Sequence, residues 1–364
     1  MKQYLELLDK ILAEGVEKES ARLNMPNTIG ISNGIIRMDL SEGFPLLTTK
    51  KMHWKGIVHE LLWFLRGETN IKYLVDNGVS IWSPDAYRWF LNYAAKNTNE
   101  NTGQNSIMFK NEDGSFRVYS QEEFINNIKL NNLGSFEYEP GLYYKLGDLG
   151  KVYGYQWRNQ NGVDQVAKVL KSLKETPYSR YHIINGWNAK NFPEMALPPC
   201  HLLYQFICRP KTIGDSINVE GKIEGKKYVM CGANMVKEIC LNSAGKTVFV
   251  LDLNMYQRSC DTALGNPYNI ASMSLLLKLF AKTCNMEEGI ATWIGGDTHL
   301  YVNHIENAKM QAKRIPSKLP TLNINKELSN LEDILNLTID NFELVNYSPQ
   351  SKIEYKLSAG LKIS

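Results

Sequence analysis

Apolar side chains stand at every second position between residues 249 and 255, and this alternation is the strongest constraint that the sequence places on the fold. A period of two is typical of a β-strand with one buried face. An apolar segment over residues 202–208 is expected to be its antiparallel partner. A long apolar helix is expected over residues 269–286. The residues expected on the buried side of that helix are Ile270, Met273, Leu276, Leu277 and Phe280.

Two polar segments interrupt this apolar framework. Residues 87–147 are rich in Asn, Glu and Lys and look inserted, so we expect surface structure there and no chemistry. Residues 209–246 form a Gly- and Lys-rich segment that is longer than a hairpin between two paired strands needs. We interpret both segments as insertions in a single catalytic domain that spans residues 1–364.

The composition limits the classes of protein to which the chain can belong. The chain has 364 residues, of which 43% are hydrophobic and 22% charged, as in an ordinary globular protein with ample material for a core. A net charge of +3 is too small to indicate general electrostatic binding to nucleic acid. The six cysteines form no CxxC pair, the first residues predict an amphipathic helix, and no apolar run has membrane-spanning length. We therefore expect a cytoplasmic protein with no membrane partner.

A cysteine and an arginine stand out among the polar motifs. Cys200 ends the run Ala196-Leu-Pro-Pro-Cys200, and Arg258 lies in Tyr256-Gln-Arg-Ser-Cys-Asp261. A free thiol has a pKa of about 8.5, so a nucleophilic cysteine needs a cation or a helix N-terminus beside it. Arg258 can supply that cation. The alternative is a buried structural cysteine.

Other candidates carry a structural alternative as well. Glu60 is surrounded by apolar residues in a helix predicted over residues 59–65, so it is expected to be buried. A buried carboxylate either accepts hydrogen bonds or has a raised pKa, and the second condition is typical of catalytic acids and bases. Spacing alone slightly favours a structural hydrogen bond between helices. His299 and Tyr301 would share one face of a strand, and they lack partners at the spacing of a zinc site.

Seven segments together resemble the thymidylate synthase family, in its folate-dependent form with a catalytic cysteine. The resemblance covers nearly the whole chain apart from the two insertions. The segments are Gly43-Phe-Pro-Leu-Leu-Thr-Thr-Lys50, His59-Glu-Leu-Leu-Trp-Phe-Leu65, Tyr153-Gly-Tyr-Gln-Trp157, Ala196-Leu-Pro-Pro-Cys-His201, Tyr256-Gln-Arg-Ser-Cys-Asp261, Leu264-Gly-Asn-Pro-Tyr-Asn-Ile-Ala-Ser272 and Gly296-Asp-Thr-His-Leu-Tyr301.

The resemblance implies an α/β (α+β) fold with a large mixed or antiparallel sheet, flanking helices, and a homodimer interface on one sheet face. It also implies two substrates, 2′-deoxyuridine 5′-monophosphate (dUMP) and 5,10-methylenetetrahydrofolate, and no metal. Cys200 would add to C6 of the uracil, and this would make C5 nucleophilic towards the folate methylene.

The family pattern also assigns roles to individual residues. Glu60 would move protons, Tyr153 would help to remove the C5 proton, and Asn269 would read the uracil. The phosphate would be bound by Arg22, Ser259, Arg258 and, from the partner subunit, Arg180. His299 and Tyr301 would bind the sugar hydroxyl. The folate would be contacted by Lys50, Trp82, Asp261, Leu264, Gly265 and Tyr268, and Asp261 is counted with the catalytic residues too.

Four departures from the family pattern bear on the product. They are the glycine-free loop at residues 22–28, Tyr181 in place of an arginine, Asp85 where several bacterial members have tryptophan, and a changed tail ending at Ser364. The family tail excludes water while hydride is delivered, so a wetter site would favour 5-hydroxymethyl-dUMP and tetrahydrofolate over thymidylate and dihydrofolate. Thymidylate synthesis is the first choice and dUMP hydroxymethylation the alternative. A non-catalytic protein that binds nucleotide or RNA is a third hypothesis.

Overall fold

The computed structural model describes residues 1–20, 25–96, 108–110, 116–139, 142–212, 225–230, 236–241 and 246–356. Arg22 and the tail ending at Ser364 lie outside these ranges. Among the described helices, none combines the length and the apolar character that crossing a membrane requires.

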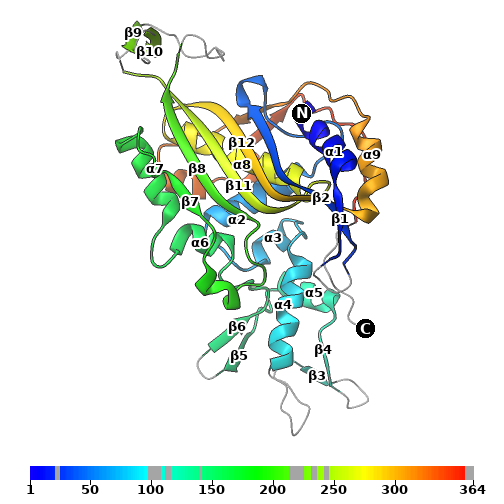
Figure 1. The fold of residues 1–364 in the computed structure, drawn as a ribbon. Coiled ribbons are helices and arrows are strands. Elements are labelled where there is room, and N and C mark those ends of the chain that lie inside the picture. The colour runs from blue at the N-terminus through cyan, green and yellow to red at the C-terminus, as the bar shows by residue number, and fades with distance from the viewer. Residues whose placement is uncertain are drawn as a thin grey trace.

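A six-stranded sheet forms the centre of the fold (Figure 1). Only β11 and β12 run parallel, and the other neighbours are antiparallel. The predicted antiparallel pairing of residues 202–208 with 249–255 is confirmed, with Met255 opposite Tyr204. In sheet order the strands are β1 (Val16–Lys18), β2 (Thr28–Asp39), β12 (Glu287–Tyr301), β11 (Phe249–Asp261), β8 (His201–Pro210) and β7 (Ile183–Asn185).

The long helix α8 (Gly265–Thr283) connects the two parallel strands, which cannot be joined by a tight turn. It begins four residues earlier than the predicted start at 269, because a proline is tolerated in the first turn of a helix and Pro267 therefore does not delay it. The helix ends before Asn285, which has a left-handed φ of 54°. All five residues predicted on its buried side are buried.

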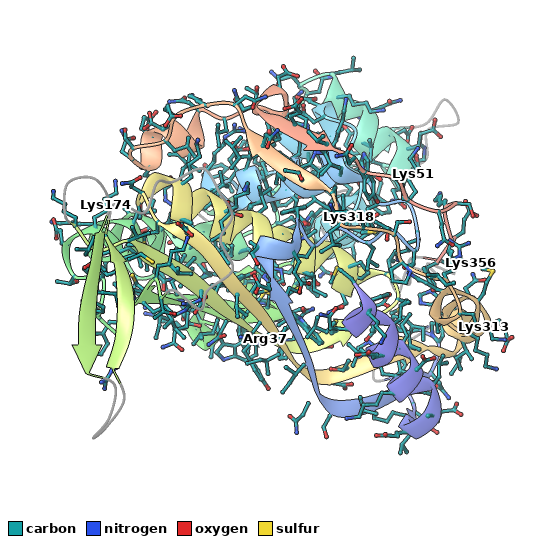
Figure 2. All side chains as sticks on the ribbon, turned by 90° about the horizontal axis from the view of Figure 1, so that it is seen from above. Arg37, Lys51, Lys174, Lys313, Lys318 and Lys356 are labelled. Carbon is teal, nitrogen blue, oxygen red and sulfur yellow. The ribbon has the colours of Figure 1, made fainter. Side chains whose placement is uncertain are left out.

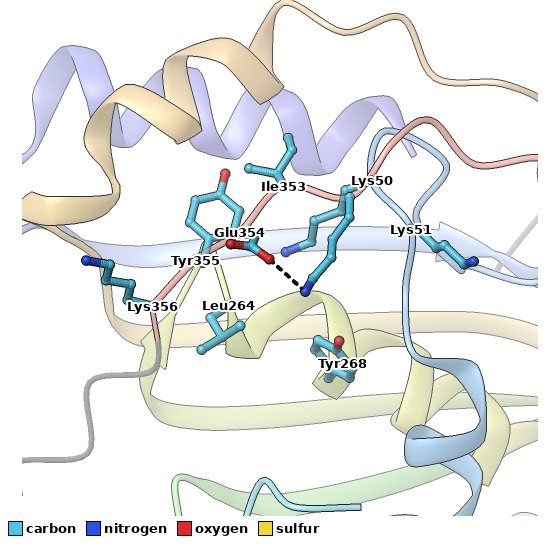
Figure 3. Close-up of a pocket in the computed structure, with 9 residues that line it drawn as sticks. Lys50, Lys51, Leu264, Tyr268, Ile353, Glu354, Tyr355 and Lys356 are labelled. Atoms are coloured by element: carbon cyan, nitrogen blue, oxygen red, sulfur yellow. Dashed lines mark hydrogen bonds and ion pairs between the residues drawn. The ribbon is translucent and has the colours of Figure 1, made fainter. Parts of the chain in front are cut away.

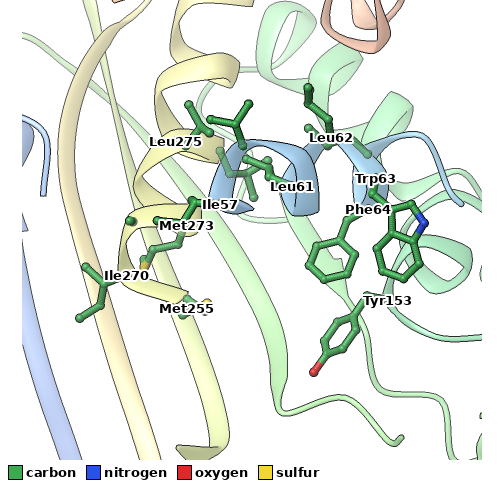
Figure 4. Packing of buried hydrophobic residues seen from close by; sticks show 14 of the residues in the cluster. Ile57, Leu61, Leu62, Trp63, Phe64, Tyr153, Met255, Ile270, Met273 and Leu275 are labelled. Atoms are coloured by element: carbon green, nitrogen blue, oxygen red, sulfur yellow. The ribbon is translucent and has the colours of Figure 1, made fainter. Parts of the chain in front are cut away.

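Helix α2 (Trp54–Leu65) packs against α8 and α6 and completes the core over the inner face of the sheet. Figure 4 shows side chains of α2 beside Tyr153, Met255 and residues of α8. The predicted helix over residues 59–65 is thus confirmed as the second half of α2. Around this core lie α1 (Lys2–Glu14), α3 (Lys72–Asp76), α6 (Tyr153–Asn159), α7 (Gln165–Glu175) and α9 (Ile305–Ala312).

The other face of the sheet is open in the single chain. Ile35, Ile207 and Tyr256 are exposed on three different strands, by 62%, 40% and 40%. Arg37 follows Ile35 on the same face of β2, where Figure 2 labels it. This face combines large apolar side chains with polar ones.

The described part of the inserted residues 87–147 contains helices, strands and buried aromatic side chains. Phe90, Phe124 and Tyr144 are buried and their rings pack together. The elements lie below the sheet in the view of Figure 1. They are α4 (Ser83–Lys96), β3 (Met108–Lys110), β4 (Phe116–Val118), α5 (Gln121–Lys129), β5 (Ser135–Glu139) and β6 (Leu142–Lys145).

Short elements make up the rest of the described chain. The second insertion contains the hairpin strands β9 (Gly225–Met230) and β10 (Val236–Leu241). The C-terminal part mixes short strands and turns and contains β13 (Thr321–Ile324), α10 (Leu331–Leu335) and β14 (Phe342–Val345). Short 3-10 helices are η1 (Leu40–Glu42), η2 (Ala189–Glu194), η3 (Val302–His304) and η4 (Ile339–Asn341).

Candidate active site

Cys200 lies directly before β8, and the pairing of β8 with β11 brings Arg258 beside it. The Arg258 amide donates to the Cys200 carbonyl at 2.8 Å. The guanidinium Nη2 lies 3.7 Å from the Cys200 Sγ. A cation at this distance favours the thiolate over the thiol. The structure therefore brings together the two residues that the sequence singled out.

Tyr153 contacts Cys200 from α6. Its hydroxyl oxygen accepts a hydrogen bond from the Cys200 amide at 2.6 Å. The Tyr153 side chain is buried, and burial raises its pKa well above the ordinary value, so the phenol stays protonated. A neutral phenol can accept from the amide and still offer its own proton.

A buried histidine, His201, stacks on Tyr153 with ring centroids 4.2 Å apart. Its Nδ1 lies 2.8 Å from the hydroxyl of Tyr204. Burial lowers the pKa of His201 to about 3, so the ring is neutral at physiological pH. The sequence patterns assign no role to His201 or Tyr204, although the position of His201 next to Cys200 is a usable signal.

Glu60 projects from α2 and its Oε1 accepts a hydrogen bond of 2.7 Å from the indole of Trp82. Burial raises the pKa of Glu60 to about 7, and the Trp82 hydrogen bond opposes part of that rise. The carboxyl thus both accepts a hydrogen bond and has a raised pKa, and its donor, Trp82, lies just before α4 and not on a second helix. A carboxyl with such a pKa can give and accept protons at pH 7.

The amide of Asn269 is held by a chain of hydrogen bonds that starts in the sheet. The Trp293 indole donates to Gln257 Oε1 at 2.8 Å, and Gln257 Nε2 donates to Asn269 Oδ1 at 3.1 Å. Gln257 Nε2 also donates to the Ser259 carbonyl at 3.0 Å. These contacts fix which way the Asn269 amide points. The sequence patterns assign no role to Gln257, because two of its side-chain partners, Asn269 and Trp293, lie on other elements and no local pattern shows these contacts.

Asp261 shapes the turn between β11 and α8. Its Oδ1 accepts from the amides of Ala263 at 3.1 Å and Leu264 at 3.0 Å. His304 Nδ1 lies 3.9 Å from the same oxygen. Asp261 thus has a clear local structural role, and it positions the start of α8, where Gly265 lies.

His299 and Tyr301 lie close together on β12, as the sequence predicted. Their ring centroids are 5.5 Å apart. His299 Nδ1 lies 3.3 Å from Asp297 Oδ1, and Lys18 pairs with Asp297 at 2.7 Å. The His299 hydrogen bond and Lys18 hold the pKa of Asp297 at about 2. The pair therefore presents a ring nitrogen and a phenol from an extended strand.

A cavity of about 310 Å³ lies between the start of α8 and residues 352–356 (Figure 3). Three of the residues predicted to contact the folate, Lys50, Leu264 and Tyr268, line this cavity. Lys50 Nζ donates to the Ala263 carbonyl at 2.6 Å, and burial lowers its pKa to about 8. Trp82 does not line this cavity and instead contacts Glu60 and the ring of Tyr153.

Arg180 lies far from Cys200 within one chain. The register of β7 places Ile183 opposite Gln205, so the residues before Ile183 run towards the far end of β8. Cys200 and Ile207 are seven positions apart in the chain, which corresponds to roughly 24 Å of strand. Arg180 is exposed, and Tyr181 after it is 87% exposed. A single chain therefore does not bring Arg180 to its own cysteine.

A cysteine beside a guanidinium, together with a carboxyl that titrates near neutrality, is the arrangement expected of an enzyme with a nucleophilic thiol and a proton-transfer group. The described residues hold no cluster of three potential metal ligands. A family model described as Thymidylate synthase matches residues 2–359.

Three relatives, all named thymidylate synthase, match along nearly their full lengths. The protein of Mycoplasma mobile is 39% identical over 358 residues, which cover 98% of this chain and 100% of the relative. The protein of Mesoplasma florum is 38% identical, with 97% and 98% covered. The protein of Buchnera aphidicola is 36% identical, with 98% and 100% covered. The chain belongs to the thymidylate synthase family.

Proposed function

We propose that this enzyme converts dUMP to thymidylate with 5,10-methylenetetrahydrofolate as co-substrate, which becomes dihydrofolate. The observation that carries the proposal is the 3.7 Å contact between Arg258 and the Cys200 sulfur. It supplies the activated nucleophile that covalent addition to uracil requires. Membership of the family and the names of the relatives support the choice of substrates.

The first step is addition of the Cys200 thiolate to C6 of the uracil. The S–C6 bond forms, and the electron pair of the C5–C6 double bond moves towards C5 and O4. Arg258 remains beside the sulfur and balances its charge before the addition. The folate supplies the one-carbon unit and, later, the hydride.

Protons are handled by Glu60 and Tyr153. Glu60, with a pKa of about 7, can donate a proton towards O4 when the base becomes an enolate and recover it later. Tyr153 lies against the Cys200 amide, and because its phenol stays protonated it helps to remove the C5 proton by hydrogen-bonding to a solvent water that takes this proton, not by taking it itself. Release of the thiol from C6 restores the enzyme.

The polar residues position the nucleotide. Asn269, oriented by Gln257, offers one donor and one acceptor, which matches O4 and N3–H of uracil. His299 and Tyr301 bind the sugar hydroxyl. The phosphate is bound by Arg258, Ser259, Arg22 and the partner's Arg180.

The active unit is a homodimer that pairs the open sheet faces. The distance of Arg180 from its own Cys200 supports this, because only a second chain could bring it to a phosphate. The exposed Ile35, Ile207 and Tyr256 provide apolar surface for such an interface. A cytoplasmic location also remains a prediction from the sequence.

Product analysis tests the proposal. The enzyme is incubated with dUMP and methylenetetrahydrofolate, and the nucleotide is examined by mass spectrometry while dihydrofolate is followed by absorbance. A methyl addition with an equal amount of dihydrofolate is expected. A hydroxymethyl addition without dihydrofolate would establish the hydroxymethylase alternative, and no product would favour a binding protein. A Cys200→Ser variant should be inactive in either reaction.

A further inference from the structure

Backbone carbonyls on the approach to Cys200 are held by guanidinium groups. Arg258 Nε donates to the Pro199 carbonyl at 2.7 Å and Nη2 to the Pro198 carbonyl at 3.0 Å. A second arginine, Arg88, donates from Nη2 to the Ala196 carbonyl at 3.0 Å. Ala196 is buried, so loss of that donor would leave a buried carbonyl oxygen without it. Arg88 therefore supports the start of the loop as Arg258 supports its end.

Arg88 is itself held in place by Asp85. The two residues lie one turn apart on α4, and Asp85 Oδ1 accepts from Arg88 Nη2 at 2.5 Å. Their side chains are only 21% and 33% exposed. The carboxylate balances the charge of the guanidinium and fixes its direction towards Ala196. Asp85, one of the departures from the family pattern, thus has a defined partner.

The chain after the inserted segment holds the same loop from the other side. The Ala196 amide donates to the Leu149 carbonyl at 2.9 Å, and the Lys151 amide to the Glu194 carbonyl at 2.9 Å. Gly150 has a φ of +73°, and a Cβ there would lie 1.9 Å from the Glu194 oxygen. Only glycine fits this close approach. Residues at the start of segment 87–147 and directly after its end therefore both hydrogen-bond to residues 194–196.

We propose that Arg88, oriented by Asp85, is a positioning residue that fixes the Cys200 thiol through the carbonyl of Ala196. Two prolines, Pro198 and Pro199, follow Ala196 and stiffen the connection to Cys200, since each fixes its φ. The inserted segment, in which the sequence predicts no chemistry, then serves the reaction through Arg88. The inference rests on the proposed function for the identity of the substrate only.

Alkylation of Cys200 tests the inference without any substrate. The rate of reaction with iodoacetamide is measured from the mass of the Cys200 peptide, beside kcat and KM for dUMP. Arg88→Met is expected to lower the alkylation rate and kcat about tenfold and to change the KM by less than about twofold, because a displaced nucleophile slows the reaction more than binding. Arg88→Lys, which keeps one donor, is expected to recover most of the rate.

Arg158 offers a matched control. It donates to the Leu65 carbonyl at 2.5 Å and pairs with Asp164 at 2.8 Å, so Arg158→Met also removes a guanidinium between a carboxylate and a carbonyl. This variant is expected to lower the unfolding temperature and leave the alkylation rate unchanged. Equal loss of alkylation in both variants would reduce Arg88 to a purely structural role and overturn the inference.

A double variant separates position from charge. In Asp85→Asn with Arg88→Met no unpaired carboxylate remains, while the Ala196 carbonyl still lacks its donor. We expect the alkylation rate to stay low, and recovery to the wild-type rate would refute the inference. If the wild-type enzyme makes no thymidylate but Arg88→Met still slows alkylation, the proposed function fails while the positioning role stands. If Arg88→Met does not fold, Asp85→Asn replaces it: the guanidinium loses the carboxylate that orients it, so the alkylation rate is expected to fall, and an unchanged rate in a folded Asp85→Asn variant would overturn the inference.

Discussion

The Trp82 indole donates a 2.7 Å hydrogen bond to the Glu60 carboxylate, and it does so from the residue just before α4. This contact joins the predicted proton-transfer residue to the segment that also carries Arg88. It lowers the pKa of Glu60 while burial raises it, and the balance leaves the pKa at about 7. The protonation state of Glu60 is thus set by two opposing effects from different parts of the chain.

Replacing Trp82 by phenylalanine tests this balance. The ring remains, but the carboxylate loses its donor, so the pKa of Glu60 should rise further above 7. A hydrogen bond to a charged group contributes about 1.5–3 kcal/mol, which corresponds to roughly one to two pKa units. Glu60 must be protonated to donate towards O4, so the alkaline limb of the pH profile of kcat is expected to move to higher pH.

Trp63→Phe is the control for that variant, because the Trp63 indole donates to the Asn70 carbonyl at 2.9 Å instead. Its alkaline limb should stay where it is in the wild type. An unmoved limb in Trp82→Phe would show that Glu60 does not set the pH dependence.

Gln257→Leu should impair recognition of the base. The variant removes the donor that orients Asn269 and leaves the Trp293 indole without its acceptor. We expect kcat/KM for dUMP to fall about tenfold and the free energy of unfolding to fall by about 1–3 kcal/mol, the cost of an unpaired buried donor. Steady-state kinetics and denaturant unfolding measure the two effects.

Gln165→Leu separates the two effects, since Gln165 Nε2 donates to the carbonyls of Gln156 and Asn185 at 2.8 Å each. It should lose stability without a selective loss of kcat/KM. A Gln257→Leu variant with normal kinetics would mean that Asn269 needs no orienting partner.

Tyr153→Phe should slow removal of the C5 proton. The phenyl ring can still stack on His201, but the Cys200 amide loses its 2.6 Å acceptor. A decrease of about 10²-fold is expected in the release of tritium from C5-labelled dUMP, which is a typical contribution of a positioned acid or base. The comparison variant is Tyr204→Phe, which removes only the hydroxyl beside His201. Equal tritium release from wild type and Tyr153→Phe would exclude Tyr153 from this step.

Lys50 should make stability depend on pH in the alkaline range. Burial lowers the pKa of Lys50 to about 8 in the folded protein, below the ordinary value of 10.5 that applies to the unfolded chain. Between these pH values the unfolded chain binds more protons than the folded one, so stability due to this group rises with pH, by about 3 kcal/mol at most. Lys50→Met should lack this rise.

The measurement for Lys50 is denaturant unfolding at pH 7.5 and pH 10 of the wild type, Lys50→Met and Lys51→Met. Lys51 is an exposed neighbour and should behave as the wild type does. A parallel change in all three proteins would contradict a buried, titrating Lys50.

Patterns within single segments are sufficient to predict several elements. The alternation over residues 249–255 predicts a strand with Leu251, Leu253 and Met255 buried, because a period of two fixes which side chains face the core. The apolar helix and the antiparallel partner strand follow from the same kind of evidence. The family motifs alone indicate Cys200, Arg258 and Glu60 as the chemical centre.

How these residues meet depends on the tertiary fold. Arg258 reaches Cys200 because β8 and β11 pair with a register shift between Tyr256 and Gln257, and no spacing in the sequence shows that shift. Arg88 and Ala196 are 108 residues apart, so their contact is invisible to local patterns. Periodicity and residue chemistry can be predicted from the sequence because they depend on neighbouring residues. The pKa of Glu60, the orientation of Asn269 and the support of the Cys200 loop depend on burial and on distant partners, and these exist only in the folded chain.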